Sequence, residues 1–377
     1  MSEEISPAHS DRGRPIEGAN ADATRETLLE LDSVTRRFDT EAAVDQLSLS
    51  VREGELLTLL GPSGCGKTTT LRLLAGLERP DSGTIRVRNE VVAGEDRFVT
   101  PEDRNIGLIF QDFALFPHLS VAANVAYGIQ DRPDDAIDRR VEELLDLVGL
   151  SAYGDHSPDS LSGGQRQRVA LARSLAPEPD VLLLDEPFSN LDVGLRTEMR
   201  EEVRRILKAA DVTAISVTHD QEEALSISDR VGVMHDGRLE QVGRPEAVFQ
   251  NPASRFVAHF LGHAGFVTGR REDGAVSTVL GSIDRGRLVG YDPAMDGSTI
   301  DVLVRPDDLG ISDDDATGAD GRIIHRQYTG PSFVYRIELE TGAVVHAQVN
   351  HVDRFEVGQA VTVDLTADHP LAWFPRD

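Results

Sequence analysis

The chain has 377 residues, enough for one full-sized domain and a smaller one, and its composition, 40% apolar and 27% charged, is that of a globular protein. A formal net charge of −27 repels phosphate backbones and anionic lipids, so we expect no nucleic-acid partner and no unaided membrane binding. No apolar run approaches the ~20 residues of a membrane helix, and the N-terminal residues lack the apolar core of a signal peptide.

Residues 1–26 mix charged residues with Ser, Pro, Gly and Ala, and we expect a disordered tail there. Short strands are predicted next, over residues 28–34, 43–51 and 56–60. The last of these is a continuous apolar run, which indicates a strand buried on both faces. It leads into a glycine-rich loop and an apolar segment, and a turn between strands is expected at residues 81–83.

Two amphipathic helices alternate with buried strands further along the chain. Apolar side chains fall on one helical face over residues 134–150 and again over residues 195–207. The buried strands are predicted at residues 106–110, 181–184, 214–217 and 231–234. Because strands alternate with helices, we expect a largely parallel α/β sheet.

The hydrophobic pattern changes past Pro252. Helical periodicity stops there, and segments of alternating apolar and polar residues, separated by glycines, follow. The strands predicted in this part are residues 300–304, 333–339, 344–349 and 361–365. They indicate a small, barrel-like all-β domain. We therefore divide the chain into residues 1–26, 27–262 and 263–377.

A phosphate-binding loop is predicted between the strand at residues 56–60 and the helix that follows. Its residues are Gly61, Pro62, Ser63, Gly64, Cys65, Gly66, Lys67, Thr68 and Thr69, with the spacing G-x4-G-K-T. Glycines let backbone N–H groups point at a phosphate, Lys67 supplies an ammonium for the β- and γ-phosphates, and the Thr68 hydroxyl can ligate Mg²⁺. A chance glycine-rich turn is the alternative, which the strand–loop–helix context disfavours. Cys65, the single cysteine, is interpreted as a small filler and not as a redox-sensitive thiol.

Lysine occurs only at Lys67 and Lys208, and arginine supplies the other positive charges. Retention of lysine in the loop supports the phosphate assignment, because a flexible point charge suits that site better than a planar guanidinium. An acidic chain with almost no lysine is typical of organisms that live in concentrated salt. An ordinary acidic protein from a GC-rich genome is the alternative.

A second glycine-rich segment consists of Leu161, Ser162, Gly163, Gly164 and Gln165, and it opens a predicted helix. Such a segment is an anion-binding nest at a helix N-terminus. One nucleotide does not need two nests from the same chain, whereas two copies that face each other would use both. The sequence therefore predicts a dimer.

These two motifs resemble those of the ABC ATPases, and the resemblance covers roughly residues 27–260. In that family, ATP lies between the P-loop of one subunit and the signature motif of its partner, here residues 161–165. The resemblance implies an α/β fold, a P-loop NTPase cassette with a mixed sheet and a helical subdomain. It also implies a head-to-tail homodimer that hydrolyses ATP with Mg²⁺.

The resemblance assigns roles to residues at the expected strand ends. Asp185, directly after the strand at residues 181–184, matches the Walker B carboxylate and joins Thr68 and Gln111 as a predicted Mg²⁺ ligand. Glu186 matches the catalytic base that takes a proton from the attacking water. His219 matches the histidine that contacts the γ-phosphate, and Gln111 matches the Q-loop glutamine that links the site to the membrane subunit.

Three further residues follow from the same resemblance. Asp192 matches the D-loop aspartate that contacts the opposite subunit, although Asn190 stands where the family usually has alanine. Phe38 occupies the position where the family stacks an aromatic ring on adenine, and a core ring is the alternative.

The C-terminal part resembles the small OB-like (TOBE) domain that ends many importer ATPases, on the evidence of residues 302–311. Such a domain braces the dimer or binds a regulatory ligand, and a purely structural role is the alternative. The apolar stretch at residues 113–121 matches the surface that receives the membrane subunit, with buried core as the alternative. The resemblance thus implies an importer ATPase on the cytoplasmic face of the membrane, with two integral permease subunits and, indirectly, an extracytoplasmic solute-binding protein.

The solute is predicted to be ferric iron, because residues 115–129, 304–308 and 370–375 look most like ferric-iron importer ATPases. Importers of spermidine or putrescine, sulfate, molybdate and sugars share much of this pattern. A hypothesis of another class is an ATP-dependent cytosolic switch without transport, whose β domain binds a ligand or partner.

Overall fold

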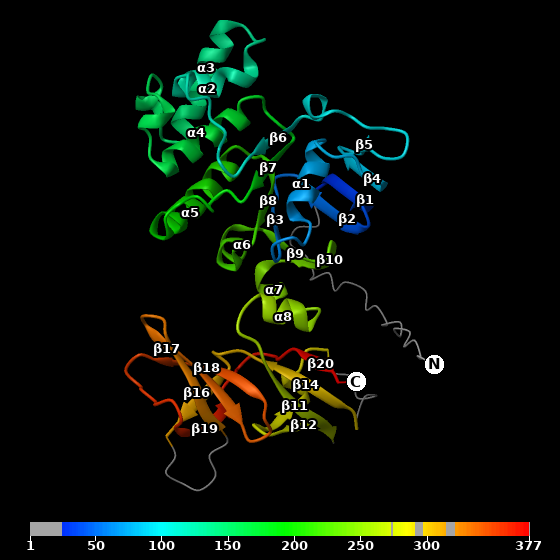
Figure 1. Cartoon of the computed structure of the whole chain (residues 1–377), viewed down its shortest axis with the longest axis vertical. Helices are drawn as coiled ribbons and strands as arrows, with labels where there is room; N and C mark the ends of the chain where they lie inside the picture. The colour runs from blue at the N-terminus through cyan, green and yellow to red at the C-terminus, as the bar shows by residue number, and fades with distance from the viewer. Residues whose placement is uncertain (1–24, 273, 291–296, 314–320, 377) are drawn as a thin grey trace.

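The computed structural model describes residues 25–272, 274–290, 297–313 and 321–376. The predicted tail therefore lies outside the described residues, apart from its last two positions. Figure 1 shows a mixed α/β part at one end of the long axis, an all-β part at the other, and two short helices between them. Within the described ranges, no helix is both long and apolar enough to cross a bilayer.

Two sheets form the α/β part. The first is antiparallel, in the order β2-β1-β4-β5: β1 Thr27–Phe38, β2 Glu41–Arg52, β4 Ser82–Val87 and β5 Glu90–Ala93. The second has the order β10-β9-β3-β8-β7-β6: β3 Leu56–Leu60, β6 Ile106–Ile109, β7 Val181–Asp185, β8 Thr213–Thr218, β9 Arg230–His235 and β10 Arg238–Gly243. Its pairings are parallel except for that of β10 with β9, which confirms the predicted α/β sheet.

Eight α-helices are described: α1 Lys67–Ala75, α2 Val121–Ala126, α3 Asp134–Leu147, α4 Gly163–Leu175, α5 Val193–Ala209, α6 Gln221–Ile227, α7 Pro245–Gln250 and α8 Arg255–Phe260. Alternate side chains of β7 point to opposite faces of the central sheet, and each face is covered by different helices. Val181 and Leu183 join the core that contains α1, whereas Leu182 and Leu184 join the core that contains α2 to α5. The central sheet therefore separates the helix of the predicted phosphate loop from the other helices (Figure 1).

The C-terminal part contains two five-stranded antiparallel sheets, in the orders β13-β12-β11-β14-β20 and β15-β19-β16-β17-β18. The first is built from β11 Gly265–Glu272, β12 Ala275–Thr278, β13 Gly281–Asp284, β14 Thr299–Val304 and β20 Trp373–Pro375. The second is built from β15 Leu309–Ser312, β16 Gly321–Tyr328, β17 Ser332–Leu339, β18 Val344–Asn350 and β19 Ala360–Leu365. The four strands predicted here are thus confirmed, within one or two residues.

Two predicted boundaries were wrong. The turn expected at residues 81–83 is the beginning of β4, and a Cβ at Gly83 would lie 2.5 Å from the Ser33 carbonyl oxygen. Gly83 therefore allows the backbone of β4 to approach β1 closely. It has a left-handed conformation, with φ +87°. Helices also continue past Pro252, because Ser254 caps α8, whose six residues are too few to show a helical period.

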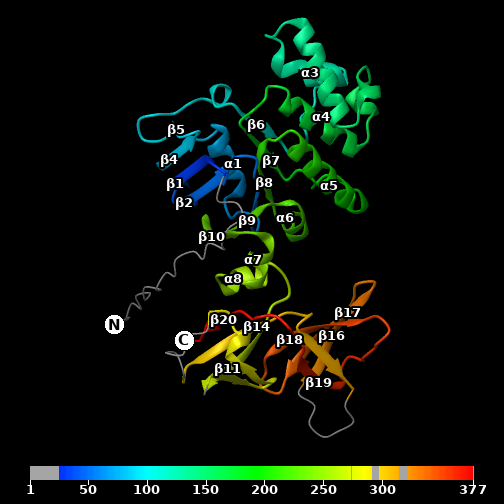
Figure 2. The same ribbon diagram turned by 180° about the vertical axis from the view of Figure 1, so that it is seen from behind.

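Two arginines connect the all-β part to the short helices α7 and α8, which lie next to it in Figure 2. Arg255 of α8 pairs with Asp301 of β14 at 2.9 Å and lies over the ring of Phe266. Arg305 is buried, lies 3.7 Å from the centre of the Phe249 ring, and donates to the Phe249 carbonyl oxygen of α7 at 2.9 Å. Directional guanidinium contacts of this kind fix the two parts against each other more specifically than apolar packing alone.

Candidate active site

The glycine-rich loop runs from β3 to α1, as predicted. Gly66 precedes α1 with φ 102°, and a Cβ there would lie 2.1 Å from the Ala43 carbonyl oxygen. A Cβ at Gly61 would lie 2.4 Å from the Met234 carbonyl oxygen. Because both clashes are with backbone, only glycine fits these positions. The loop is thus held close to its neighbours while Ser63 and Gly64 remain exposed.

Lys67 lies inside this loop and is only 6% exposed. Its Nζ donates to the carbonyl oxygens of Gly61 at 2.7 Å and Pro62 at 2.9 Å. The ammonium is therefore held at the centre of the loop, where a phosphate would meet it. Cys65 is buried in the same loop, and burial raises the pKa of its thiol. Both observations agree with its interpretation as a small filler.

Thr68 lies in the first turn of α1 and Asp185 at the carboxyl end of β7, close enough for the Thr68 hydroxyl to lower the pKa of the Asp185 carboxyl. Burial raises the pKa of Asp185, and the nearby Glu186 charge raises it further; Arg72 and Lys67 oppose both effects. A cation between these groups would offset that negative charge. One hydroxyl and one carboxylate, with phosphate and water oxygens, are the ligands that Mg²⁺ prefers, so these residues fit the ion.

Glu186 and His219 are brought together although they are 33 residues apart. His219 Nδ1 lies 3.0 Å from Glu186 Oε1, and the Glu186 N–H donates to the Val217 carbonyl oxygen at 3.0 Å. Glu186 has φ 45°, a left-handed conformation that is rare for a residue other than glycine. A strained backbone at this point marks a residue whose side-chain direction is constrained by its surroundings.

The Q-loop follows β6 and is held by two side chains. Gln111 is exposed, and its carbonyl oxygen accepts a hydrogen bond from Asn190 Nδ2 at 2.7 Å. Arg173 of α4 donates to the carbonyl oxygens of Phe113 at 2.9 Å and Ala114 at 2.7 Å. Asn190, the departure from the family pattern, therefore bonds the Q-loop backbone directly.

Sequence reasoning missed Arg173. Partial burial lowers the pKa of this guanidinium, which reaches from α4 to the Q-loop backbone. The signal was available, because Arg173 follows Val169 and Ala170 at helical spacing and so falls on an otherwise apolar face. A charged residue on such a face usually has a specific partner, here the Q-loop backbone.

The second glycine-rich segment begins α4. Ser162 and Gln165 form a capping box: the Ser162 N–H donates to Gln165 Oε1 at 2.9 Å, and the Gln165 N–H donates to Ser162 Oγ at 3.3 Å. Leu161 is buried and Ser162 is exposed. A Cβ at Gly164 would lie 2.9 Å from the Met199 sulfur, so this glycine allows α4 to pack against α5. Gly163 is half-buried beside them.

The structure does not place this segment at the glycine-rich loop of the same chain. Helix α4 packs with α2 and α3 and belongs to their core, whereas α1 belongs to the core of the antiparallel sheet. Figures 1 and 2 both show α4 apart from α1. The segment at residues 161–165 and the loop at residues 61–69 therefore lie in different parts of the same chain.

Asp192 and Phe38 lie at the surface. Asp192 is exposed at the N-terminus of α5, and Arg196 fixes the backbone before it by donating to the Leu191 carbonyl oxygen at 2.9 Å. Phe38 ends β1, is 43% exposed, and carries the Arg36 guanidinium 4.8 Å from its ring centre. Phe38 is thus not a core ring, the alternative considered from the sequence.

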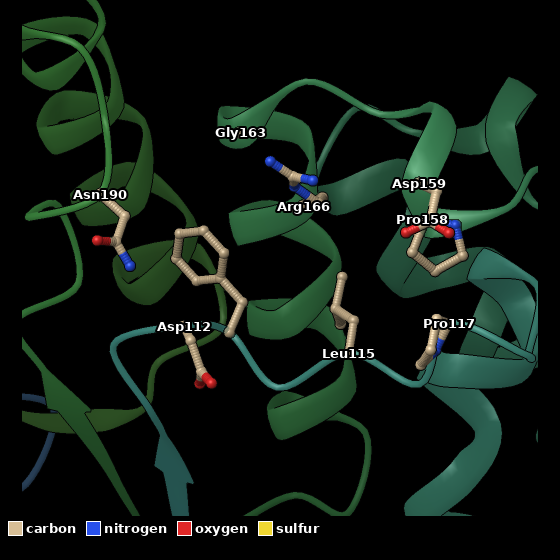
Figure 3. Close-up of a pocket in the computed structure, with 9 residues that line it drawn as sticks. Asp112, Leu115, Pro117, Pro158, Asp159, Gly163, Arg166 and Asn190 are labelled. Carbon is tan, nitrogen blue, oxygen red and sulfur yellow. The ribbon is translucent and has the colours of Figure 1, made fainter.

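A pocket of about 320 Å³ opens between the Q-loop and α4. Figure 3 shows Asn190 on one side of it, Pro117, Pro158 and Asp159 on the other, and Arg166 between them. The apolar stretch at residues 113–121 is only partly at this surface. Val121 is buried in the core, whereas the buried Phe113 and the half-buried Leu115 line the pocket.

The fold and this site define a P-loop ATPase. A model of the family described as ABC transporter matches residues 44–189, and a model of the TOBE domain matches residues 302–373.

Curated relatives match most of the chain. It is 43% identical over 330 residues to the spermidine/putrescine import ATP-binding protein PotA of Marinobacter nauticus, covering 86% of this chain and 87% of the relative. It is 49% identical over 283 residues to the sulfate/thiosulfate import ATP-binding protein CysA 2 of Chromobacterium violaceum (74% and 75%). It is 42% identical over 330 residues to the Fe(3+) ions import ATP-binding protein FbpC of Agrobacterium fabrum (86% and 92%).

Among solved structures, cbiO1 of Clostridium perfringens, described as part of the ABC transporter complex cbiONQ, is similar with a TM-score of 0.55 and 32% identity. The match covers 59% of this chain and 90% of that one. The chain belongs to the importer-type ABC transporter ATPases that carry a C-terminal TOBE domain.

Proposed function

We propose that this chain hydrolyses ATP as a head-to-tail homodimer and so drives import through two integral membrane permease subunits at the cytoplasmic face of the membrane. The observation that carries the proposal is the contact of 3.0 Å between Glu186 and His219, at the end of the sheet where Lys67 and Asp185 also lie. This end of the sheet thus combines four functions in one hydrolytic centre: a general base, a γ-phosphate contact, a phosphate-binding loop and a cation site.

In this proposal, residues 61–69 hold the triphosphate, and Phe38 stacks on adenine. Glu186 accepts the proton of the attacking water while His219 contacts the γ-phosphate. Thr68, Gln111 and Asp185 hold Mg²⁺, which neutralises phosphate charge when it is bound. Residues 161–165 of the partner subunit close over the same nucleotide, with Asp192 at the dimer contact. Loss of turnover with retained ATP binding in a Glu186→Gln variant tests the assignment.

The pocket between the Q-loop and α4 is proposed as the contact for the permease subunits. It is lined by Asp112 next to Gln111, by Gly163 and Arg166 of α4, and by Asn190 before Asp192. A segment docked there would touch the Q-loop, the helix that begins at the signature motif, and the D-loop together. Closure of the dimer would thus move the docked segment of the membrane subunit through direct contacts. A solute-binding protein would act indirectly, through the permease.

For the solute, we propose a polyamine, with ferric iron as the competing assignment. The relative from Marinobacter nauticus is named for spermidine/putrescine import, and the relative from Agrobacterium fabrum for Fe(3+) import, at 43% and 42% identity. The proposed contacts of this chain are with ATP, its partner subunit and the permease, so its residues do not discriminate between solutes.

Deletion of the gene is expected to abolish energy-dependent uptake of labelled spermidine and to leave uptake of labelled ferric iron unchanged. Complementation with the wild type should restore spermidine uptake, and complementation with Glu186→Gln should not, because the variant lacks the proposed base. Loss of iron uptake with normal spermidine uptake would instead establish ferric iron as the solute. Normal uptake of both would reject both assignments.

We also propose that the protein is adapted to concentrated salt. With a net charge of −27, self-repulsion destabilises the folded state, and KCl at ~2 M shortens the screening length from about 10 Å to a few Å. The midpoint of thermal unfolding, followed by circular dichroism, is expected to rise by about 5 °C or more between ~0.1 M and ~2 M KCl. NaCl at the same concentration is the control for screening. An unchanged or lower midpoint contradicts salt adaptation.

A further inference from the structure

A buried carboxyl group lies beside the proposed hydrolytic centre and has no role in it so far. Glu223 of α6 is 3% exposed, and its Oε1 is buried without a hydrogen-bond partner. Burial raises the pKa of Glu223 to about 7; the charges of Asp220 and Glu186 add to this, whereas the Thr218 hydrogen bond and Arg200 oppose it. Burial of an ionisable group next to a reaction centre requires an explanation.

Glu223 is connected by hydrogen bonds to the residues on both sides of His219. The Thr218 hydroxyl donates to Glu223 Oε2 at 2.8 Å, and the same hydroxyl accepts from the Asp220 N–H at 3.0 Å. Thr218 and Asp220 are the two chain neighbours of His219. The backbone is therefore held on both sides of the exposed histidine by one buried hydroxyl, which is itself held by Glu223.

This arrangement differs from ordinary helix capping. In a capping box, the glutamate three residues into the helix accepts directly from the N–H of the cap residue. Asp220 is the cap of α6 and accepts from the Glu223 N–H at 3.1 Å, but the Asp220 N–H is taken by Thr218. Glu223 thus reaches past the helix terminus to the last residue of β8, whose direction sets that of His219.

A second connection leads from this cluster to the D-loop. Arg200 of α5 is 4% exposed and donates to Asp220 Oδ2 at 2.6 Å, and it pairs with Glu222 at 3.1 Å. Helix α5 begins directly after Asp192. The segment that carries His219 is therefore fixed to the helix that follows the proposed dimer contact.

We propose that Glu223 is a positioning residue for ATP hydrolysis: through Thr218 it fixes the backbone around His219, so that the imidazole stays in contact with Glu186. This inference rests on the proposed function, because it assigns Glu223 a part in the same reaction. Glu223 does not touch the nucleotide in this proposal. It acts on the rate through His219 alone.

The direction of the pH effect follows from the Thr218 bond. Ionised Glu223 accepts a charge-assisted hydrogen bond, which is about twice as strong as a bond to the neutral carboxyl. As pH rises through 7, Glu223 ionises, the Thr218 segment is held more firmly, and kcat rises. The charged groups that face Glu223 are Arg200 of α5, Asp220 before α6 and Glu186 after β7, and they are the same in a variant changed only at Glu223.

The experiment measures ATPase kcat and KM from about pH 6 to about pH 8 for the wild type, Glu223→Gln and Thr218→Val. Each substitution keeps side-chain shape: Thr218→Val removes the donor, and Glu223→Gln leaves only a neutral acceptor that cannot ionise. In both variants we expect kcat at pH 8 to fall about tenfold, KM for ATP to change less than about twofold, and the rise with pH to flatten. The exposed Glu246→Gln on α7 changes the net charge equally and should behave as wild type.

Two further measurements separate positioning from loss of fold. The double variant should be no slower than Thr218→Val alone, because without the Thr218 hydroxyl the charge of Glu223 has no bond to strengthen. The Glu223→Gln protein should unfold at no lower temperature than wild type at pH 8, since it no longer buries an ionised carboxylate. Additive losses in the double variant, or a kcat and pH profile equal to wild type in Glu223→Gln, would overturn the inference.

The two proposals fail in different ways. If Glu186→Gln retains normal turnover, the proposed hydrolytic centre is wrong, and the positioning role is overturned with it. If Glu186→Gln is inactive while Glu223→Gln keeps the wild-type rate and pH profile, only the positioning role is overturned. Rescue of kcat by Thr218→Ser, which restores the hydroxyl, would support it further.

Discussion

A Glu186→Gln variant is expected to bind Mg·ATP normally while its turnover falls by about 10²- to 10⁴-fold. Glutamine has the shape of glutamate and can still meet His219 Nδ1, now 3.0 Å from Oε1, so the site should remain assembled. An amide cannot take a proton from the attacking water, so the chemical step is the one that fails. The measurements are phosphate release for turnover and equilibrium binding of labelled ATP.

The same variant should accumulate a closed dimer. With hydrolysis blocked, ATP remains between residues 61–69 of one copy and residues 161–165 of the other. Size exclusion with Mg·ATP should therefore give a stable dimer, whereas the wild type should return to its nucleotide-free state as ATP is consumed. Lys67→Ala, which removes the phosphate contact, is the control that should neither bind nor dimerise.

Normal turnover in Glu186→Gln would show that another group activates the water. His219, the other polar group at this point, would then be the first candidate. Loss of both turnover and ATP binding would point to a damaged site and would leave Glu186 without a catalytic assignment.

Sequence pattern predicted the elements whose burial is continuous or strictly periodic. The strand at residues 56–60 is buried at every position, and the helix at residues 134–150 was found as α3, Asp134–Leu147. Short elements escaped, because six residues of α8 show fewer than two helical turns. Gly83 was misread for a related reason: a glycine that allows two backbones to approach looks the same in sequence as a turn glycine.

The site was predictable where a motif carries its own geometry. The glycine-rich loop runs from the end of β3 into the first turn of α1 as expected, because the loop conformation depends on glycines within it. That Glu186 and His219 meet could be anticipated only from the family resemblance, since 33 residues separate them and two parallel strands, β7 and β8, bring them together.

The hydrogen-bond partners of Arg173 and Glu223 could not be predicted from the sequence. Arg173 holds the Q-loop across 60 residues, and Glu223 bonds Thr218 instead of the cap of its own helix. In each case the residue type shows that a partner must exist, because buried charge without a partner is costly. Which partner it finds depends on the packing of α4 and α6 against the sheet, and no local pattern records that packing.

The second large effect concerns the dimer, and it is expected in mixtures of two inactive variants. Lys67→Ala removes the phosphate contact of the glycine-rich loop. Ser162→Asp places a negative charge where the signature segment would meet the γ-phosphate, and it keeps α4 capped because aspartate is as good an N-cap as serine. Ser162→Asn caps equally well without the charge and is the matched control. Each inactive variant alone should lose at least about 100-fold in ATPase rate.

In a head-to-tail dimer of one copy of each variant, one site combines both defects and the other combines neither. The intact site joins the loop of the Ser162→Asp copy to the signature segment of the Lys67→Ala copy. Each mixed dimer keeps one of its two sites intact, so it should recover up to about half of the wild-type rate per dimer. Differently tagged variants, purified together after mixing, give the fraction of mixed dimers by which the rate is normalised.

Recovery in this experiment cannot arise if one chain supplies both segments to its own nucleotide, because every nucleotide would then meet at least one defect. A mixture as inactive as its components, with mixed dimers shown to be present, would contradict the arrangement. The separation of the two segments into different cores of the same chain argues for recovery, since it leaves the exposed Ser162 free to meet a nucleotide presented by a partner.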